Sequence, residues 1–260
     1  MALQGKVAIV TGGGTGLGAA VSLGLAARGA NVVVNYARSV EEAERTAEAC
    51  RAQGVEAVAV KGDVDDDGAC RAVVEAAVSR WGRVDVLVNN AGRTTFAAPD
   101  DLDALSDEDF LDIYRTNLLG AYHMIRACAP HMREAGFGAV VNISSIAGLT
   151  GVGSSIAYAC SKGALNTLTL SLARALGPEI RVNAVCPGFI GTRWFSGPLG
   201  EAGMQRIIAD QEAVTPLRRA GTPEDIAKSV LFLADEGSEH ITGVTLVSDA
   251  GFHLDLGRAR

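Results

Sequence analysis

The sequence lacks long hydrophobic runs, metal-ligand spacing and paired cysteines. Its 260 residues contain five cysteines, an odd number with no Cys-x-x-Cys pair, and four scattered histidines. A disulfide framework and a zinc site are therefore disfavoured, and we expect no bound metal. The apolar stretches are too short to cross a bilayer, and no signal peptide fits before the first expected strand. We expect a cytoplasmic protein with no membrane association.

Positive charge is also scarce. The chain has 23 Lys and Arg against 30 Asp and Glu, which gives a net charge of −7. This balance, without any basic run, disfavours a nucleic-acid partner. Two acidic clusters, Asp63–Asp67 and Asp100–Asp109, are interpreted as solvated loops. The hydrophobic fraction of 48% is ample for a buried core.

Short Val-rich runs alternate with helical patterns along the whole chain. Apolar strands separated by helices are typical of a parallel sheet covered on both faces. We therefore predict an α/β fold, a single doubly wound Rossmann domain over residues 1–260 with a seven-stranded parallel sheet. The stretch Phe189–Gly203 is expected to be irregular, and a substrate loop is expected as an insertion near residues 189–213. The expected strands are Lys6–Val10, Asn31–Asn35, Val55–Val60, Val84–Asn89, Ala139–Ser144, Arg181–Val185 and Val244–Val247.

A glycine-rich turn follows the first expected strand. Residues 11–18 read Thr-Gly-Gly-Gly-Thr-Gly-Leu-Gly and open an Ala- and Leu-rich helix. Gly12 allows a tight turn, Gly16 allows close approach of a ligand to the backbone, and Gly18 allows the helix to pack on the sheet. Free N–H groups and the helix dipole then suit a dinucleotide pyrophosphate. The alternative is a plain strand-to-helix turn.

A second pattern lies far downstream. Tyr158 and Lys162 are four residues apart, so a helix over Tyr158–Leu176 places both on one face. A nearby ammonium favours the phenolate and lowers the tyrosine pKa toward a value useful in proton exchange. Ser145 ends an expected strand thirteen residues before Tyr158. An isolated Tyr-x-x-x-Lys would mean only an ordinary helix, and the serine favours a catalytic site.

The order of these motifs resembles the short-chain dehydrogenase/reductase family, and most closely its 3-oxoacyl-[acyl-carrier-protein] reductase-like members. The glycine spacing matches the family turn T-G-x-x-x-G-x-G. Asp63-Val64 is similar to the family's adenine clamp, and Asn89-Asn90-Ala91-Gly92 matches its N-N-A-G motif. Pro187-Gly188, with Thr192 four residues on, matches the loop that holds the nicotinamide carboxamide.

The resemblance implies a role for each catalytic candidate. Ser145 would bond the substrate oxygen, with Ser144 as the competing hydroxyl, and Tyr158 would donate or remove its proton. Lys162 would bind the nicotinamide ribose, and Asn117 would order a water that links Lys162 to solvent. Such a set suffices for interconversion of a ketone and a secondary alcohol by hydride transfer, with no metal.

The resemblance also implies a set of cofactor contacts. At the end of the second strand no Asp or Glu precedes Glu41, whereas Arg38 and Ser39 suit a 2′-phosphate. NADP(H) is therefore favoured and NAD(H) is the alternative, since Thr15 replaces the basic residue that many NADP-dependent relatives carry. The contacts expected are Gly12, Thr15, Gly16, Leu17, Gly18, Arg38, Ser39, Asp63, Val64, Asn90, Ala91, Gly92, Tyr158, Lys162, Pro187, Gly188, Ile190 and Thr192.

The substrate is expected to be a small carbonyl or alcohol compound in a mixed or apolar pocket. A 3-oxoacyl thioester is one alternative, although the acidic insert Pro99–Asp107 disfavours an acidic carrier protein. A catalytically silent nucleotide sensor or scaffold is another. The resemblance implies a homotetramer, or a dimer, joined through the long helices around Asn117 and Tyr158 and through the last strand. The expected pocket residues are Thr94, Thr95, Phe96, Ile146, Phe189, Trp194 and Phe195.

Overall fold

The computed structural model describes residues 3–254, including every side chain there except those of residues 196–199. Within this part of the chain, seven parallel strands form one sheet in the order β3-β2-β1-β4-β5-β6-β7. The predicted doubly wound seven-stranded sheet is therefore confirmed. The strands are β1 Val7–Val10, β2 Asn31–Tyr36, β3 Ala57–Lys61, β4 Val86–Asn89, β5 Gly138–Ile143, β6 Ile180–Pro187 and β7 Thr245–Ser248.

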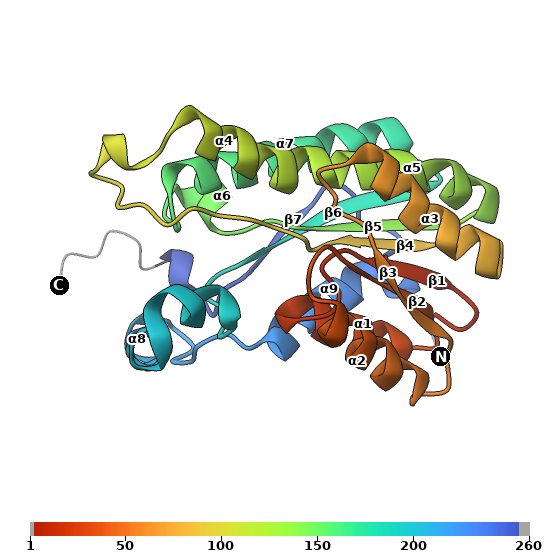
Figure 1. Cartoon of the computed structure of the whole chain (residues 1–260), viewed down its shortest axis with the longest axis horizontal. Helices are drawn as coiled ribbons and strands as arrows, with labels where there is room; N and C mark the ends of the chain where they lie inside the picture. Colours follow the sequence, from red (N-terminus) through yellow and green to blue (C-terminus); the bar gives the residue numbers. More distant parts are fainter. Residues whose placement is uncertain (1–2, 255–260) are drawn as a thin grey trace.

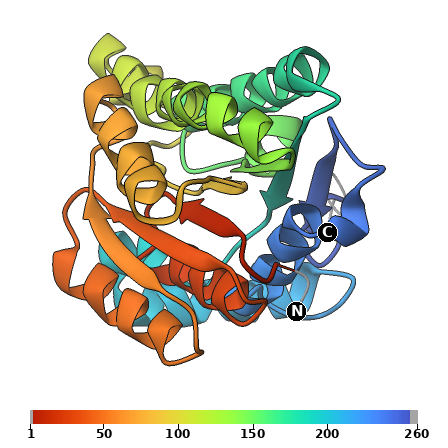
Figure 2. The ribbon, with the colours of Figure 1, turned by 90° about the vertical axis from the view of Figure 1, so that its right-hand side faces the viewer.

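Two helical layers cover the sheet (Figure 1). One layer contains α3 (Asp67–Trp81), α4 (Asp107–Tyr114), α5 (Ala121–Ala135) and α7 (Ile156–Leu176). The other contains α1 (Gly16–Ala26), α2 (Val40–Arg51) and α9 (Pro223–Ala234), and Figure 2 shows the sheet twisting between the two layers. Each face of the sheet buries its own apolar cluster. Among the helices described, none combines the length and the hydropathy that a membrane span needs.

The strand limits differ from the sequence prediction by at most two residues. β3 begins at Ala57 instead of Val55, and β4 begins at Val86 instead of Val84. β6 continues to Pro187, because Pro187 still pairs in register with Ser248 of β7. Pairing partners therefore decide where a strand ends, and these partners lie far away in the sequence.

The stretch after β6 is more regular than expected. Helix α8 covers Arg193–Val214, so most of the stretch 189–203 is helical where irregular backbone was expected, and the substrate role of the insertion near 189–213 stays a prediction. Gly200 interrupts the helix with φ 66° and ψ 178°, a conformation open to glycine. The glycines and the proline in this stretch hid the helical periodicity. A π-helical turn, Arg115–Gly120, also replaces regular helix around Asn117.

An ionic cluster anchors the amino edge of the sheet. Asp85, just before β4, is fully buried. Its carboxylate accepts the N–H of Val7 at 2.9 Å and forms a bidentate pair with Arg83 at 2.8 and 2.6 Å. Lys6 Nζ lies 3.8 Å from the same carboxylate. Because these bonds satisfy the buried charge, they fix β1 against β4 at the edge opposite the chemistry described below.

Candidate active site

A cleft of about 1740 Å³ opens at the carboxyl edge of the sheet, between α8 and the segments that follow the strands. Helices α6 (Ala147–Thr150) and α8 flank this edge (Figure 1). The cleft brings together nearly all of the predicted site residues. Two of them, Gly18 and Asn117, lie behind its wall. Those that line it are Gly12, Thr15, Gly16, Leu17, Arg38, Ser39, Asp63, Val64, Asn90, Ala91, Gly92, Ser145, Tyr158, Lys162, Pro187, Gly188, Ile190 and Thr192.

The glycine turn is shaped by backbone crowding. Gly12 and Gly16 have φ values of +59° and +51°, in the left-handed region that favours glycine. A Cβ atom on Gly18 would lie 2.1 Å from the Gly12 carbonyl oxygen and 2.7 Å from Asn90 Nδ2. Gly18 therefore allows α1 to pack on the turn itself, which differs from the contact with the sheet that the sequence suggested.

Thr11, to which the sequence alone assigned no role, ties the glycine turn to the end of β4. Its Oγ1 accepts the backbone N–H groups of Asn90 at 2.9 Å and Ala91 at 3.0 Å. Asn90 Nδ2 donates in return to the carbonyls of Thr11 at 2.9 Å and Gly12 at 3.1 Å. The position of Thr11 directly after the first strand was the one feature of the sequence that could have indicated this role. These reciprocal bonds hold two predicted cofactor segments in one fixed arrangement.

The amino end of α1 faces the cleft with its N–H groups free of side-chain caps. Thr15 makes no capping bond, and the first turn contains no acidic residue. Oriented N–H groups at a helix start attract an anion. The Thr192 side chain lies 3.4 Å from the position that a Cβ on Gly16 would take, so it borders the same space. The cradle therefore fits a dinucleotide pyrophosphate.

The far end of the cleft lies beside α2. Arg38 is exposed, Ser39 precedes the helix, and both line the cleft. Buried Asn35 donates through Nδ2 to the carbonyls of Val60 at 3.2 Å and Gly62 at 2.9 Å, which fixes the spacing of β2 and β3. Asp63 lies on the cleft wall, where its Oδ1 accepts the N–H of Asp65 at 3.2 Å.

The two neighbouring serines have different surroundings. Ser144 is buried, and its hydroxyl donates to the Lys162 carbonyl at 3.1 Å. Ser145 is half-buried, and its Oγ accepts the N–H of Ala147 at 3.1 Å. The Ser144 hydroxyl thus donates inside the protein, whereas the Ser145 hydroxyl lies beside Tyr158 and acts to lower the pKa of its phenol. The geometry favours the same serine as the spacing.

Tyr158 and Lys162 lie on one face of α7, as expected, but their electrostatics differ from the prediction. Lys162 Nζ donates to the Ile143 carbonyl at 2.8 Å and lies 5.6 Å from the Tyr158 ring centroid. Burial raises the pKa of Tyr158 to about 12, against the opposing effect of Ser145. Burial also lowers the pKa of Lys162 to about 8. The net pKa of Tyr158 is therefore raised in the protein alone, because loss of hydration disfavours the phenolate, and the lowering by Lys162 stays a prediction.

The Asn117 side chain lies behind the cleft wall and forms hydrogen bonds with Arg93 and Ser161. Its Oδ1 accepts the N–H of Arg93 at 2.8 Å, and its Nδ2 donates to the Arg93 carbonyl at 3.0 Å and to Ser161 Oγ at 2.9 Å. The side chain therefore holds the segment after β4 against α7. The water-ordering role stays a prediction.

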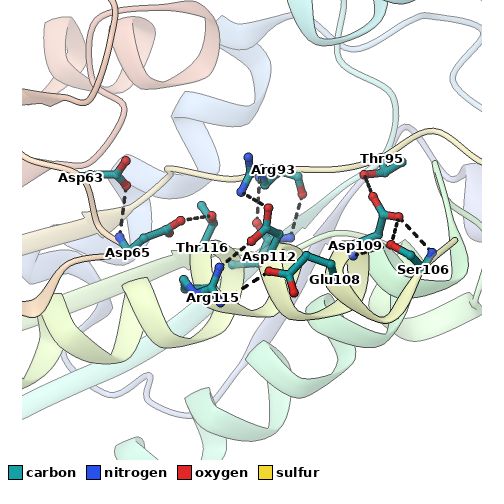
Figure 3. A network of polar contacts seen from close by, with 11 residues as sticks. Asp63, Asp65, Arg93, Thr95, Ser106, Glu108, Asp109, Asp112, Arg115 and Thr116 are labelled. Carbon is teal, nitrogen blue, oxygen red and sulfur yellow. Dashed lines mark hydrogen bonds and ion pairs between the residues drawn. The ribbon is translucent and has the colours of Figure 1, made fainter.

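Aromatic side chains form the substrate side of the cleft. The ring centroids of Phe189 and Phe195 are 4.9 Å apart, and Phe96 lies 6.2 Å from Phe195. Trp194 lies 5.9 Å from Tyr158. Among the other expected pocket residues, Thr94 and Ile146 line the cleft, and Thr95 bonds to α4 (Figure 3). The aromatic residues thus line the cleft and also pack on one another.

Comparisons with known proteins identify the family of the chain. A sequence model of the family described as enoyl-(acyl carrier protein) reductase matches residues 12–253. A protein of Streptomyces violaceoruber, named as a candidate ketoacyl reductase 2 of the granaticin polyketide synthase, is 44% identical over 256 residues, or 96% of this chain and 97% of its own. An L-rhamnose 1-dehydrogenase (NAD(P)(+)) of Sphingomonas sp. is 38% identical and covers 98% of both chains.

The fold also matches a solved structure. A crystal structure of a candidate short-chain dehydrogenase/reductase from Burkholderia xenovorans superimposes with a TM-score of 0.88 at 38% identity. The match covers 96% of this chain and 98% of the other. The family model, the relatives and this structure all indicate the same family. The chain belongs to the short-chain dehydrogenase/reductase family, whose members are nicotinamide-dependent oxidoreductases of carbonyl and hydroxyl groups.

Proposed function

We propose that this protein interconverts a ketone and a secondary alcohol, with Tyr158 as the acid/base group and NADP(H) as the favoured cofactor. One observation carries the proposal: Ser145, Tyr158 and Lys162 line the same cleft as the glycine turn. A group bound along the turn therefore reaches the hydroxyl groups of Ser145 and Tyr158 without any rearrangement of the sheet.

A nicotinamide dinucleotide, when bound, supplies or accepts the hydride. The amino end of α1 and Thr192 would hold its pyrophosphate, and Asp63 with Val64 would hold its adenine. Pro187, Gly188 and Ile190 would border its nicotinamide. These groups come from several strand ends, so the parallel sheet fixes their spacing.

The hydroxyl pair handles the substrate oxygen. With a pKa of about 12, Tyr158 is a phenol at neutral pH and holds the proton that a ketone oxygen needs on reduction. Ser145 donates a second hydrogen bond and orients that oxygen. Lys162, held by the Ile143 carbonyl, keeps an ammonium near the tyrosine below pH 8 and so offsets the negative charge left after proton transfer.

The preference for NADP(H) rests on the region beside α2. Arg38 and Ser39 line the cleft there, and no carboxylate lies between the end of β2 and Glu41. A guanidinium and a hydroxyl favour a 2′-phosphate, and NAD(H) is the alternative. Arg38→Ala should raise the Kd of NADPH about tenfold and leave that of NADH unchanged.

The substrate class follows from the cleft wall. Phe96, Phe189, Trp194 and Phe195 favour a ketone with an apolar or planar body. A 3-oxoacyl thioester is the second candidate, favoured by the relative named as a ketoacyl reductase. The exposed residues Asp100, Asp101 and Asp103 beside the entrance disfavour its delivery by an acidic carrier protein.

The test is nicotinamide absorbance with NADPH and NADH against a panel of ketones, thioesters, sugars and quinones. Tyr158→Phe should lower kcat by at least about 10³-fold and keep the Kd of the cofactor, because only the proton donor is removed. Turnover that persists in this variant would overturn the mechanism. Cofactor binding without turnover of any panel member would support the sensor alternative.

Assembly and location are part of the proposal. Leu119, Tyr122 and Leu170 are exposed on the layer formed by α5 and α7, which supports a homotetramer or dimer through these helices. All five cysteines are free thiols, which supports a reducing cytoplasm. Light scattering that gave the mass of one chain would overturn the assembly proposal.

A further inference from the structure

The segment 93–97 forms one wall of the cleft and has no regular secondary structure. Its position therefore depends on side-chain and backbone bonds to its neighbours. Phe96 is 42% exposed at the entrance and faces Phe195 of α8, with ring centroids 6.2 Å apart. The separation of this segment from α8 thus limits the size of a ligand that reaches Tyr158.

Two carboxylates on α4 bind this segment from its outer side. Arg93 Nη1 lies 3.0 Å from Asp112 Oδ2, and Thr95 Oγ1 donates to Asp109 Oδ1 at 2.9 Å. Figure 3 shows Asp109 and Asp112 side by side on α4, both directed at the segment. The second oxygen of Asp109 accepts the N–H of Ser106 at 2.9 Å in a capping box, so the helix start fixes its orientation.

The inner side of the segment is tied to the loop before the catalytic helix. Thr94 Oγ1 and Ser154 Oγ are 2.6 Å apart, and the N–H of Ala97 donates to the Ser154 carbonyl at 3.0 Å. The next residue, Ser155, caps α7 by accepting the N–H of Tyr158 at 3.3 Å. The segment therefore connects α4 to the start of the helix that presents the acid/base group.

The bonds alternate along the segment. Arg93 and Thr95 bond to α4, whereas Thr94 bonds to Ser154 and, with Arg93 and Phe96, lines the cleft. Thr95 directly precedes Phe96, so release of the Thr95 and Arg93 bonds to α4 frees the backbone on this side of Phe96. The two hydrogen bonds between the Asn117 side chain and the Arg93 backbone fix only one end of the segment. The position of Phe96 therefore depends on α4 through the preceding residue, Thr95, and on Ser154 through the following residue, Ala97.

From this arrangement we propose that Asp109 and Asp112 are positioning residues that select the substrate by size. They hold Phe96 at a set distance from α8 and so admit ketones up to a certain bulk. The inference rests on the proposed ketone reductase activity and adds a determinant of its substrate range. It concerns residues that touch neither cofactor nor substrate.

Two variants release the segment from α4. Thr95→Val removes one hydroxyl and leaves the capping box of Asp109 intact, and Asp112→Asn removes the charge opposite Arg93. Arg80→Gln is the matched control, because it removes an exposed ion pair, with Glu56, and lies outside α4, the segment and the cleft wall. Thr95→Ser restores the hydroxyl and should behave as the wild type.

The first measurement is amide hydrogen exchange of residues 93–98 in the full chain without a ketone. Exchange should quicken at least about fivefold in the combined Thr95→Val and Asp112→Asn variant and stay unchanged in the control. The second is kcat/KM for a compact and a bulky ketone. Their ratio should shift at least about fivefold, through KM of the bulky ketone, while the Kd of NADPH stays constant.

The outcomes separate this inference from the proposed function. Absence of ketone turnover in the wild-type enzyme would defeat the proposed function. Unchanged exchange, or an unchanged substrate ratio in an active enzyme, would overturn the positioning role. A fall in kcat/KM that is equal for both ketones would also overturn it, because a general structural defect has no preference for size.

Discussion

The turn after β1 and the segment after β6 lie at the same edge of the sheet, but they are held in different ways. In the turn, backbone atoms leave no space: a Cβ on Gly18 would lie 2.1 Å from the Gly12 carbonyl oxygen. In the segment after β6, a backbone bridge of Ile190 with Gly221 is supplemented by side-chain contacts, through the Phe189–Phe195 pair and the exposed ion pair of Arg193 with Glu42. Backbone shape therefore dominates one half of the cleft and side-chain identity the other.

The difference separates two tasks. A surface built from backbone N–H groups and glycines recognises a constant group such as a pyrophosphate. A surface built from aromatic side chains changes its shape with each substitution. The cofactor half should therefore fail when any side chain is added, whereas the substrate half should change its preference and still work.

The strongest test of this contrast is Gly18→Ala. A single methyl group would collide with the Gly12 carbonyl and with Asn90 Nδ2, so we expect at least about a 100-fold loss of NADPH affinity and about 3 kcal/mol of lost stability. Fluorescence titration and urea unfolding measure the two effects. Gly237→Ala is the control, because no atom lies within 4 Å of the place that its added methyl group would take, and it should match the wild type.

Lys162→Met tests what a buried charged side chain on α7 costs in stability, in contrast to the backbone packing of the glycine turn. Burial lowers the pKa of Lys162 to about 8, from an ordinary value of 10.5. Below pH 8 the lysine is charged in both states, so the folded protein bears the full cost of burying the ammonium. Without cofactor, the variant should be more stable than the wild type by about 2 kcal/mol at pH 7.

That advantage should shrink as the pH rises from 8 to 10.5, because the folded protein then releases the proton before the unfolded chain does. Urea unfolding of both proteins at pH 7 and pH 9.5 measures the change. An advantage that is independent of pH would show that Lys162 affects stability only through packing.

Phe195→Leu addresses the substrate half. The substitution removes two aromatic contacts, with Phe189 and Phe96, but no hydrogen bond of the cofactor cradle. We expect kcat/KM to change about tenfold among ketones of different shape, with the Kd of NADPH unchanged. Steady-state kinetics with three ketones would show this. A uniform loss for all ketones would contradict the division of the cleft.

The smallest effect is expected from Arg193→Gln. This arginine pairs with Glu42 at 3.0 Å across the entrance, and its side chain is 65% exposed. Exposed pairs contribute little because water and salt screen them, so the Tm should fall by less than about 2 °C. A thermal scan at low and high salt tests this. A larger fall at low salt would mean that the ion pair fixes α8.

The sheet could be predicted because every strand is short, rich in valine and bounded by helices. The glycine turn and the Tyr158–Lys162 pair could be predicted because their spacing directly encodes local geometry. The tyrosine pKa could not, since it depends on burial by groups distant in the sequence. Asp109 was expected in a solvated loop, but it lies in the first turn of α4 and bonds Thr95, a contact between segments fourteen residues apart.

The buried Asp85 cluster lies at the edge of the sheet opposite the cleft, where it joins β1 to β4. Substitutions around Phe96 or Phe195 do not touch it, so a change of substrate leaves this anchor of the sheet in place. Selection can act on stability at one edge and on chemistry at the other, with little conflict between them. Such independence makes the chain a suitable scaffold for directed evolution toward new ketones.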